Sequence, residues 1–297
     1  MLKMKVKNAI GWISVSISIL TACFLAYWGI IENFHEGWYY TSFLKNIGLM
    51  LIQYLSPMII TISLTLVSIR QNKFGALLFI IIGGILSFLV NNAIISIPFI
   101  ILGILYWFSD FYQKKWKYRL SFILPFVIII IFGIEPVIRI NERINDKNYG
   151  IRIIEQNNIS LVWAPQGPGW PNDGTNWFKA DSICKYLSED GLSITSQPTN
   201  IWRLPTVEEV VKSMQKHGVN CKGRINSKGE PEYEIRPDKE TSLWNPNSKV
   251  IYWWTKTEID KYNSYMIVYD EKIWKRRKDF GSNYLGFRAV KNRELKE

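Results

Sequence analysis

Histidine and cysteine are scarce in this chain, which has two histidines and three cysteines among its 297 residues. Metal sites built on these residues usually show short, repeated ligand spacings. Neither Cys184 nor Cys221 belongs to such a spacing, and a general-base role for His217 has no visible partner. His35 lies at the edge of a predicted membrane helix. We therefore expect no metal site, no cofactor and no catalytic residue from these side chains.

Charge is absent from long stretches of the first half. Residues 10–31 carry no charged side chain, and a helix of this length can cross the roughly 30 Å hydrocarbon core of a bilayer. The run exceeds the core of a signal peptide, and no small-residue cleavage site follows Trp28, so we expect it to stay uncleaved. Four more apolar runs predict transmembrane helices at 46–69, 75–90, 93–109 and 120–138. Pro57 is expected to kink the first of these four.

The positions of lysine and arginine predict the orientation. The apolar stretch 75–108 is too long for one crossing, and we expect a tight hairpin that turns at Asn91 and Asn92. Three basic clusters then fall on one side of the membrane: Lys3, Lys5 and Lys7; Arg70 and Lys73; and Lys114, Lys115, Lys117 and Arg119. Short basic loops stay in the cytoplasm, which places the N-terminus inside and residues 139–297 outside.

The predicted helices have little that transport would use. Glu135 is their one charged residue away from the loops, whereas transporters and pumps usually carry charged groups and broken helices at mid-membrane. An anchor or a partner-binding bundle fits better, with transport as the lesser alternative. The Glu-Gly after the first helix and the run Pro-Phe-Ile-Ile-Leu-Gly-Ile-Leu at 98–105 resemble an uncharacterised bacterial four-helix membrane module. That resemblance implies no activity.

The second half is polar and modestly basic. Residues 1–138 hold 10 basic and 4 acidic side chains, which leaves 26 and 21 for residues 139–297 and gives net charges of +6 and +5. A dispersed excess of this size does not indicate nucleic-acid binding. We expect a linker over 139–158, a folded domain over 159–292 and a tail over 293–297.

Two amphipathic helices are predicted early in this domain. Ala180, Ile183, Cys184 and Leu187 recur at helical spacing, and Gly191 can end that helix. In the second, Thr206 caps the N-terminus, Glu209 completes a capping box and Pro205 fixes the entering chain. Its apolar stripe is Val207, Val210, Val211 and Met214, and Gly218 supplies the stop. We expect Trp202 and Leu204 to pack under it and Arg203 to meet a buried carboxylate or carbonyl.

Short strand-like runs make up most of the remainder. They lie at 159–165, 250–255, 264–269, 272–276 and 284–290. Asp270 and Glu271 join the third run to the fourth, which predicts a hairpin. At least one of Trp253 and Trp254 is expected in the core. Helices followed by an antiparallel sheet make an α+β domain.

Four blocks of this half resemble a known bacterial family. They are Trp177, Ala180, Cys184 and Leu187 at their spacing, "WRLPTVEE" at 202–209, "YWWTKTE" at 252–258 and "YLGFRAVK" at 284–291. In order and spacing they resemble the C-terminal domain family of the collagen-like adhesin Lcl, which is related to formylglycine-generating and sulfatase-modifying enzymes. The resemblance implies a C-type-lectin-like fold with these signature residues: Trp202, Arg203, Pro205, Thr206, Glu209 and Arg288.

The resemblance also suggests where a ligand would bind. Long loops commonly form the recognition surface of lectin-like folds, which makes Lys239, Glu240, Trp244, Lys256 and Glu258 the candidates. Cys184 and Cys221 could serve a related oxidase, form a disulfide in an oxidising compartment, or remain a core thiol and a loop residue. The triplet-like "QPTN" and "WPND" fit turns better than calcium ligands. The basic edge "KIWKRRK" at 272–278 could contact anionic headgroups or acidic glycans, although a solvated, aggregation-resistant edge is the simpler interpretation.

These inferences describe a multipass inner-membrane protein. Five helices present an extracytoplasmic α+β domain that binds or senses a protein, peptide or glycan, with the lipid bilayer as its other partner. No catalysis is expected. The alternatives are an enzyme related to sulfatase-modifying factors with an altered site, or a structural subunit of a membrane complex.

Overall fold

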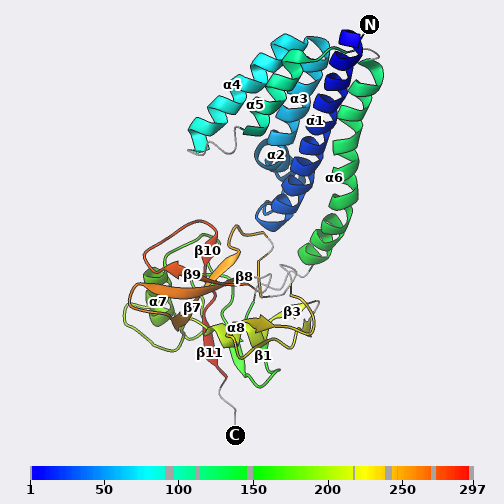
Figure 1. Cartoon of the computed structure of the whole chain (residues 1–297). Helices are drawn as coiled ribbons and strands as arrows, with labels where there is room; N and C mark the ends of the chain where they lie inside the picture. Colours follow the sequence, from blue (N-terminus) through cyan, green and yellow to red (C-terminus); the bar gives the residue numbers. More distant parts are fainter. Residues whose placement is uncertain are drawn as a thin grey trace. The chain divides into compact units, whose positions relative to one another are not determined.

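The computed structural model describes residues 2–90, 97–111, 114–145, 150–216, 218–237, 243–245, 247–268 and 272–293. Contacts divide the chain into two compact units. We call Met1–Trp38 with Ser42–Pro136 the membrane unit, and Tyr39–Thr41 with Val137–Glu297 the β-rich unit. Figure 1 shows long helices in the first and strands with two short helices in the second.

The membrane unit is entirely helical in its described part. Its helices are α1 (Leu2–His35), α2 (Phe43–Leu49), the π-helix η1 (Met50–Tyr54), α3 (Ser56–Arg70), α4 (Asn72–Val90), α5 (Ile97–Phe108) and α6 (Lys114–Asn145). Among the described helices two are long and apolar enough to span a membrane, within α1 and α6, and the bent pair α2–η1 and α3 makes a third if it counts as one span. The bend of 61° falls just before Pro57, where a kink is expected.

The predicted spans 75–90 and 93–109 correspond to α4 and α5, which are shorter apolar helices. Asn72 at the start of α4 donates from Nδ2 to the carbonyl of Ser109 just after α5, at 2.6 Å, so the two helices run antiparallel. A Cβ on Gly103 would lie 2.6 Å from Ile80 and 2.9 Å from the carbonyl of Ala76, which shows how closely they pack. The expected turn residues Asn91 and Asn92 lie outside the described residues.

The three basic clusters meet at one end of the membrane unit. The N–H of Asp110, after α5, donates to the carbonyl of Lys7 at 3.1 Å. The Nζ of Lys114 lies 3.4 Å from the carbonyl of Arg70. At the start of α4, Lys73 lies over the ring of Trp107 near the end of α5, with 5.9 Å from Nζ to the ring centroid. α6 begins at this same end and runs away from it.

The β-rich unit has two main sheets. Its strands are β1 (Arg152–Ile154), β2 (Leu161–Trp163), β3 (Gln215–Lys216), β4 (Val219–Asn220), β5 (Arg224–Ile225), β6 (Pro231–Glu232), β7 (Tyr252–Glu258), β8 (Asn263–Val268), β9 (Ile273–Arg277), β10 (Leu285–Gly286) and β11 (Val290–Asn292). The order is β1-β2-β11 in one sheet and β10-β7-β8-β9 in the other. β8 and β9 pair antiparallel, as the predicted hairpin requires. The segment 139–158 is not only a linker, because it contains the end of α6 and β1.

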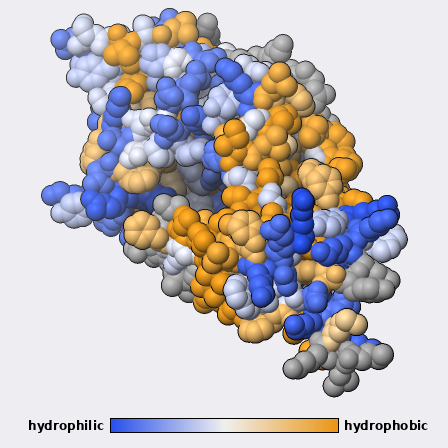
Figure 2. Space-filling view, turned by 90° about the horizontal axis from the view of Figure 1, so that it is seen from above, coloured by the Kyte–Doolittle hydropathy of each residue, from blue (hydrophilic) through white to orange (hydrophobic). Residues whose placement is uncertain are grey.

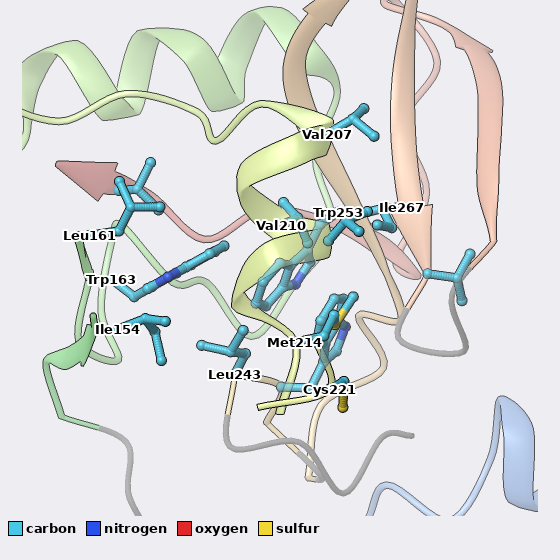
Figure 3. Close-up of a cluster of buried hydrophobic side chains, with 14 of the residues drawn as sticks. Ile154, Leu161, Trp163, Val207, Val210, Met214, Cys221, Leu243, Trp253 and Ile267 are labelled. Carbon is cyan, nitrogen blue, oxygen red and sulfur yellow. The ribbon is translucent and has the colours of Figure 1, made fainter. Parts of the chain in front are cut away.

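The four-stranded sheet separates two hydrophobic clusters. Successive side chains of a strand point to opposite faces, so Trp253 and Trp254 on β7 enter different clusters, and both are fully buried. α8 (Val207–Ser213) covers the face of Trp253, and Figure 3 shows Val210 and Met214 beside that indole and Trp163. α7 (Trp177–Tyr186) contributes Trp177, Ala180 and Cys184 to the opposite cluster.

α8 begins with the predicted capping box. The hydroxyl of Thr206 accepts from the N–H of Glu209 at 3.1 Å, and the Glu209 carboxylate accepts from the N–H of Thr206 at 2.8 Å. Arg203 donates to both carboxylate oxygens of Glu209, at 2.7 and 2.6 Å, which confirms that it meets a largely buried carboxylate. Burial alone would raise the pKa of Glu209. The hydrogen bonds and charge of Arg203, with the N–H of Thr206, hold it below its usual value.

Two predicted helix ends are wrong. α8 stops at Ser213, and the left-handed Gly218 (φ 78°) lies between β3 and β4. α7 stops at Tyr186, so Gly191 (φ 75°) belongs to a later turn. In both places the chain enters strand-like pairing before the glycine is reached, and this tertiary pairing outweighs the local stop signal. Trp202 and Leu204 are also misplaced in the prediction, because they pack in the cluster of α7 and not under α8.

Arg288 is fully buried in the β-rich unit. Its guanidinium donates to three carbonyls, those of Ala164 at 2.7 Å, Leu243 at 3.1 Å and Gly150 at 3.1 Å. It also lies 3.7 Å from the ring centroid of Trp170. Burial lowers its pKa. The side chain therefore joins segments that are far apart in the sequence through a single desolvated charge.

Substitution of Glu209 tests the capping box. We expect Glu209→Gln to lower the free energy of unfolding by about 1–3 kcal/mol at neutral pH, because it removes a charged partner of Arg203 and one side of the cap. Since the folded pKa of Glu209 is depressed, its stabilisation is complete above the unfolded pKa of about 4.3 and is lost as pH falls through the folded pKa. Urea unfolding of the full chain in detergent, followed by tryptophan fluorescence, measures this.

Glu208→Gln is the matched control, since Glu208 lies on the same helix and forms an exposed pair with Lys212. It should cost less than about 0.5 kcal/mol. Equal effects of the two substitutions, or a Glu209→Gln effect that does not diminish at acidic pH, would contradict the role given to Glu209.

Candidate functional site

The structure separates the five ligand candidates suggested by the sequence. Lys239 and Glu240 lie outside the described residues. Trp244 is 2% exposed and stacks on Trp253 with ring centroids 3.7 Å apart, so it cannot stack on an external ligand without leaving the core. Lys256 and Glu258 lie on the last residues of β7, and Lys256 is exposed there. The structure does not bring Trp244 together with these two.

Glu258 already has a partner. Its carboxylate forms an ion pair with Lys278, a side chain that is only 5% exposed. The Lys278 ammonium also lies 4.6 Å from the ring centroid of Trp177 at the start of α7. The pair thus fastens the end of β7 to α7 and to the segment after β9. A structural role accounts for Glu258, and the positive charges next to it on β9 remain open to solvent.

β9 is the exposed edge of the four-stranded sheet. Trp274 pairs with Met266 of the buried core, yet its own side chain is 49% exposed because no further strand covers it. Lys275, Arg276 and Arg277 follow it, and all are exposed. Trp274 and Arg276 point to the same face of the sheet, roughly 7 Å apart at the usual rise of a strand. Consecutive charges on an edge also discourage pairing with another strand.

Exposed aromatic rings lie next to this basic edge. Tyr262 is 68% exposed, and its carbonyl accepts from the N–H of Lys278 at 2.8 Å. Phe280 is 43% exposed, and the guanidinium of Arg276 lies 4.8 Å from its ring centroid. Phe178, 53% exposed, packs edge-on against Trp177 beneath Lys278. We call Phe178, Tyr262, Trp274, Lys275, Arg276 and Phe280 the basic aromatic surface.

Ion pairing decides which charges of this surface are available. Arg277 makes a two-point contact with Asp279, at 3.1 and 2.6 Å, that orients its guanidinium and lowers the pKa of Asp279 through hydrogen bonding. Among the described residues Lys275 and Arg276 form no ion pair, although the charge of Lys275 adds to the hydrogen bonds from Asn263 that lower the pKa of Asp260. Both side chains line an open hollow of about 630 Å3. Asn263, Arg277, Asp279 and Phe280 complete its lining. This arrangement can hold an anionic group beside an apolar ring.

The sequence predicted only part of this surface. Residues 272–278 were expected to form a basic edge, but Trp274 was not among the ligand candidates. The sequence did contain one signal for Trp274. Charged residues follow this tryptophan directly in the strand, which is typical of an exposed edge and not of a core strand. Tyr262, Phe178 and Phe280 give no such signal, because two separate loops and α7 bring them together.

The cysteines of the β-rich unit are free thiols. Cys184 is buried on α7 in one cluster, and Cys221 is buried in the other. Burial raises the pKa of both, that of Cys221 to about 11. Because the thiolate is the reactive form, neither is prepared for nucleophilic or redox chemistry. The described residues show one potential metal group, Glu32, His35 and Glu36 at the end of α1. His217 lies outside the described residues.

Comparison with known proteins adds one match. A family model described as a domain of unknown function, DUF7670, matches residues 3–121. This range runs from α1 into the start of α6, over the part that the sequence suggested was an uncharacterised membrane module. No curated protein and no solved structure matches the chain.

Thiol alkylation checks the burial of the two cysteines. Iodoacetamide at pH 8 should leave Cys184 and Cys221 unmodified in the folded full chain and modify both in denaturant, because burial disfavours the thiolate. Peptide mass spectrometry reads each site separately. A cysteine introduced at exposed Lys228 should react in the folded protein and serves as the control. Rapid modification of either native thiol in the folded chain would overturn this assignment.

Proposed function

We propose that this protein is a membrane-anchored binding module that captures an anionic glycan outside the cytoplasm. The basic aromatic surface is the observation that carries this proposal. Exposed Trp274 offers a flat apolar face to a sugar ring, and Arg276, on the same face of β9, offers donors to a carboxylate or phosphate on that sugar. The other candidate ligand classes fit this combination less well.

A peptide strand added to the edge of β9 would have to pass three consecutive cationic side chains, which is a feature that prevents strand addition. A membrane surface would favour a larger charge excess. Residues 258–280 hold six basic and five acidic side chains, a net charge of +1, whereas headgroup-binding segments carry clusters of about 4–8 uncompensated cations. Local recognition of a charged sugar is consistent with both observations.

The proposed fold and orientation support the same function. The four sequence blocks resemble a lectin-like family, and their signature residues Arg203, Glu209 and Arg288 all serve the fold of the β-rich unit. The convergence of the basic clusters at one end of the membrane unit favours a cytoplasmic position for that end. α6 leads away from it, so we infer that the β-rich unit follows on the outer side of the inner membrane.

Binding of defined glycans to the full chain in nanodiscs tests the proposal. An oligogalacturonate, whose sugars carry carboxylates, should bind, and neutral dextran should not. Trp274→Ala and Arg276→Glu should each weaken binding about tenfold, since stacking and a charged hydrogen bond each contribute about 1–2 kcal/mol. Biolayer interferometry with immobilised nanodiscs measures the affinities.

Lys228→Glu, which makes the same charge change in the turn between β5 and β6, is the matched control and should bind normally. Lys256→Glu should also bind normally, because Lys256 lies near the end of β7 and outside the basic aromatic surface. Equal binding of oligogalacturonate and dextran, or equal losses for Lys228→Glu and Arg276→Glu, would refute recognition by this surface.

A further inference from the structure

The basic end of the membrane unit has a large excess of positive charge. Seven lysine and arginine side chains are exposed there: Lys5, Lys7, Arg70, Lys73, Lys114, Lys115 and Arg119. The described carboxylate among them is Asp110, which accepts from the N–H of Phe111 at 2.8 Å. Figure 2 looks onto the end of Figure 1 at which the N-terminus lies and shows hydrophilic side chains set among hydrophobic ones. Such an end attracts anions.

A hollow lies between the first turns of α1 and the segment after α5. Met4, Lys5, Asn8, Asp110 and Phe111 line it, and its volume is about 230 Å3. The segment 110–111 approaches α1 at Gly11, where a Cβ would lie 2.7 Å from the carbonyl of Asp110. The hydrogen bond from Asp110 to the carbonyl of Lys7 fixes this approach. The hollow therefore combines apolar walls, Met4 and Phe111, with the cation of Lys5.

Tryptophans surround the same end. Trp12 is 38% exposed, Trp107 48% and Trp116 60%. Tryptophan favours the level of the lipid headgroups, because its apolar ring can contact the hydrocarbon there while its N–H stays hydrated. Lys117 is fully buried, with its ammonium 4.2 Å from the ring centroid of Trp12, so it does not add to the exposed charge. The hollow thus lies at the depth where a phospholipid has its phosphate.

We propose that this hollow binds an anionic phospholipid, with the phosphate at Lys5 and the upper part of an acyl chain against Met4 and Phe111. Lys7, on another side of α1, does not line the hollow and adds to the positive charge of this end. The pairing of cations with an apolar wall selects a lipid over a free phosphate, which has nothing to place on Met4 and Phe111. Asn8 and Asp110 can accept hydroxyl donors from a glycerol headgroup. The excess of cations over the single acid selects a lipid with net negative charge over a zwitterionic one. This site is independent of the glycan surface.

Native mass spectrometry of the detergent-purified full chain tests this site. Titration with phosphatidylglycerol should give a stoichiometric complex at concentrations where phosphatidylcholine and phosphatidylethanolamine do not bind. The double substitution Lys5→Glu with Lys7→Glu should weaken phosphatidylglycerol binding at least about tenfold, given about 1 kcal/mol for each basic side chain near a headgroup. The pair Lys228→Glu with Lys256→Glu gives the same net charge and should bind as the parent chain does.

Three results would overturn the site: equal binding of the three lipids, unchanged binding after the Lys5 and Lys7 substitutions, or equal loss in the control pair. Glycerol phosphate in excess distinguishes the sources of phosphate, because its displacement of the lipid would reassign the hollow to a soluble anion. If the double charge reversal prevents a monodisperse preparation, Lys5→Gln with Lys7→Gln should still weaken binding, and Lys5→Arg with Lys7→Arg should retain it.

Discussion

A positive charge that leaves water must receive hydrogen-bond acceptors or an aromatic face, and the β-rich unit is organised around one such charge. Arg288 brings the carbonyls of Gly150, Ala164 and Leu243 to one guanidinium and rests on the ring of Trp170. These acceptors lie 45 to 138 residues from Arg288 in the sequence. Without these acceptors the buried guanidinium would destabilise the folded state by several kcal/mol. The three segments that carry the carbonyls must therefore keep their positions around Arg288.

The same constraint acts in the membrane unit with a different result. Hydrocarbon cannot supply acceptors to lysine and arginine, so the exposed cations of the described membrane unit gather at one end, except Lys45 on α2, and the ammonium of Lys117 lies over the ring of Trp12. On the β-rich unit, water solvates the cations of β9, so Lys275 and Arg276 keep their charges at the exposed edge of the sheet. The two binding surfaces that we propose are thus the places where exposed cations outnumber the carboxylates beside them among the described residues.

Local signals in the sequence predicted a good part of this fold. Thr206 and Glu209 are three residues apart and form the capping box without help from distant segments. The predicted strands 250–255, 264–269 and 272–276 are bounded by polar turns and lie close to β7, β8 and β9. The predicted strand 284–290 is wrong, because it contains β10 and the start of β11, which belong to different sheets, and β10 pairs with β7 in parallel and not antiparallel. Trp244 was misjudged because a tryptophan has the same local pattern in a core as on a recognition surface. Only the stacking partner Trp253, which the sheet provides, decides between them.

Presentation of the β-rich unit outside the cytoplasm is the central claim, and site-directed cysteine labelling tests it most directly. Cysteines placed at exposed Lys228 and Lys115 report on the β-rich unit and on the basic end of the membrane unit. A membrane-impermeant maleimide applied to intact spheroplasts should label position 228 at once and position 115 only after the membrane is disrupted. Labelling of position 115 but not 228 in intact spheroplasts would contradict the account.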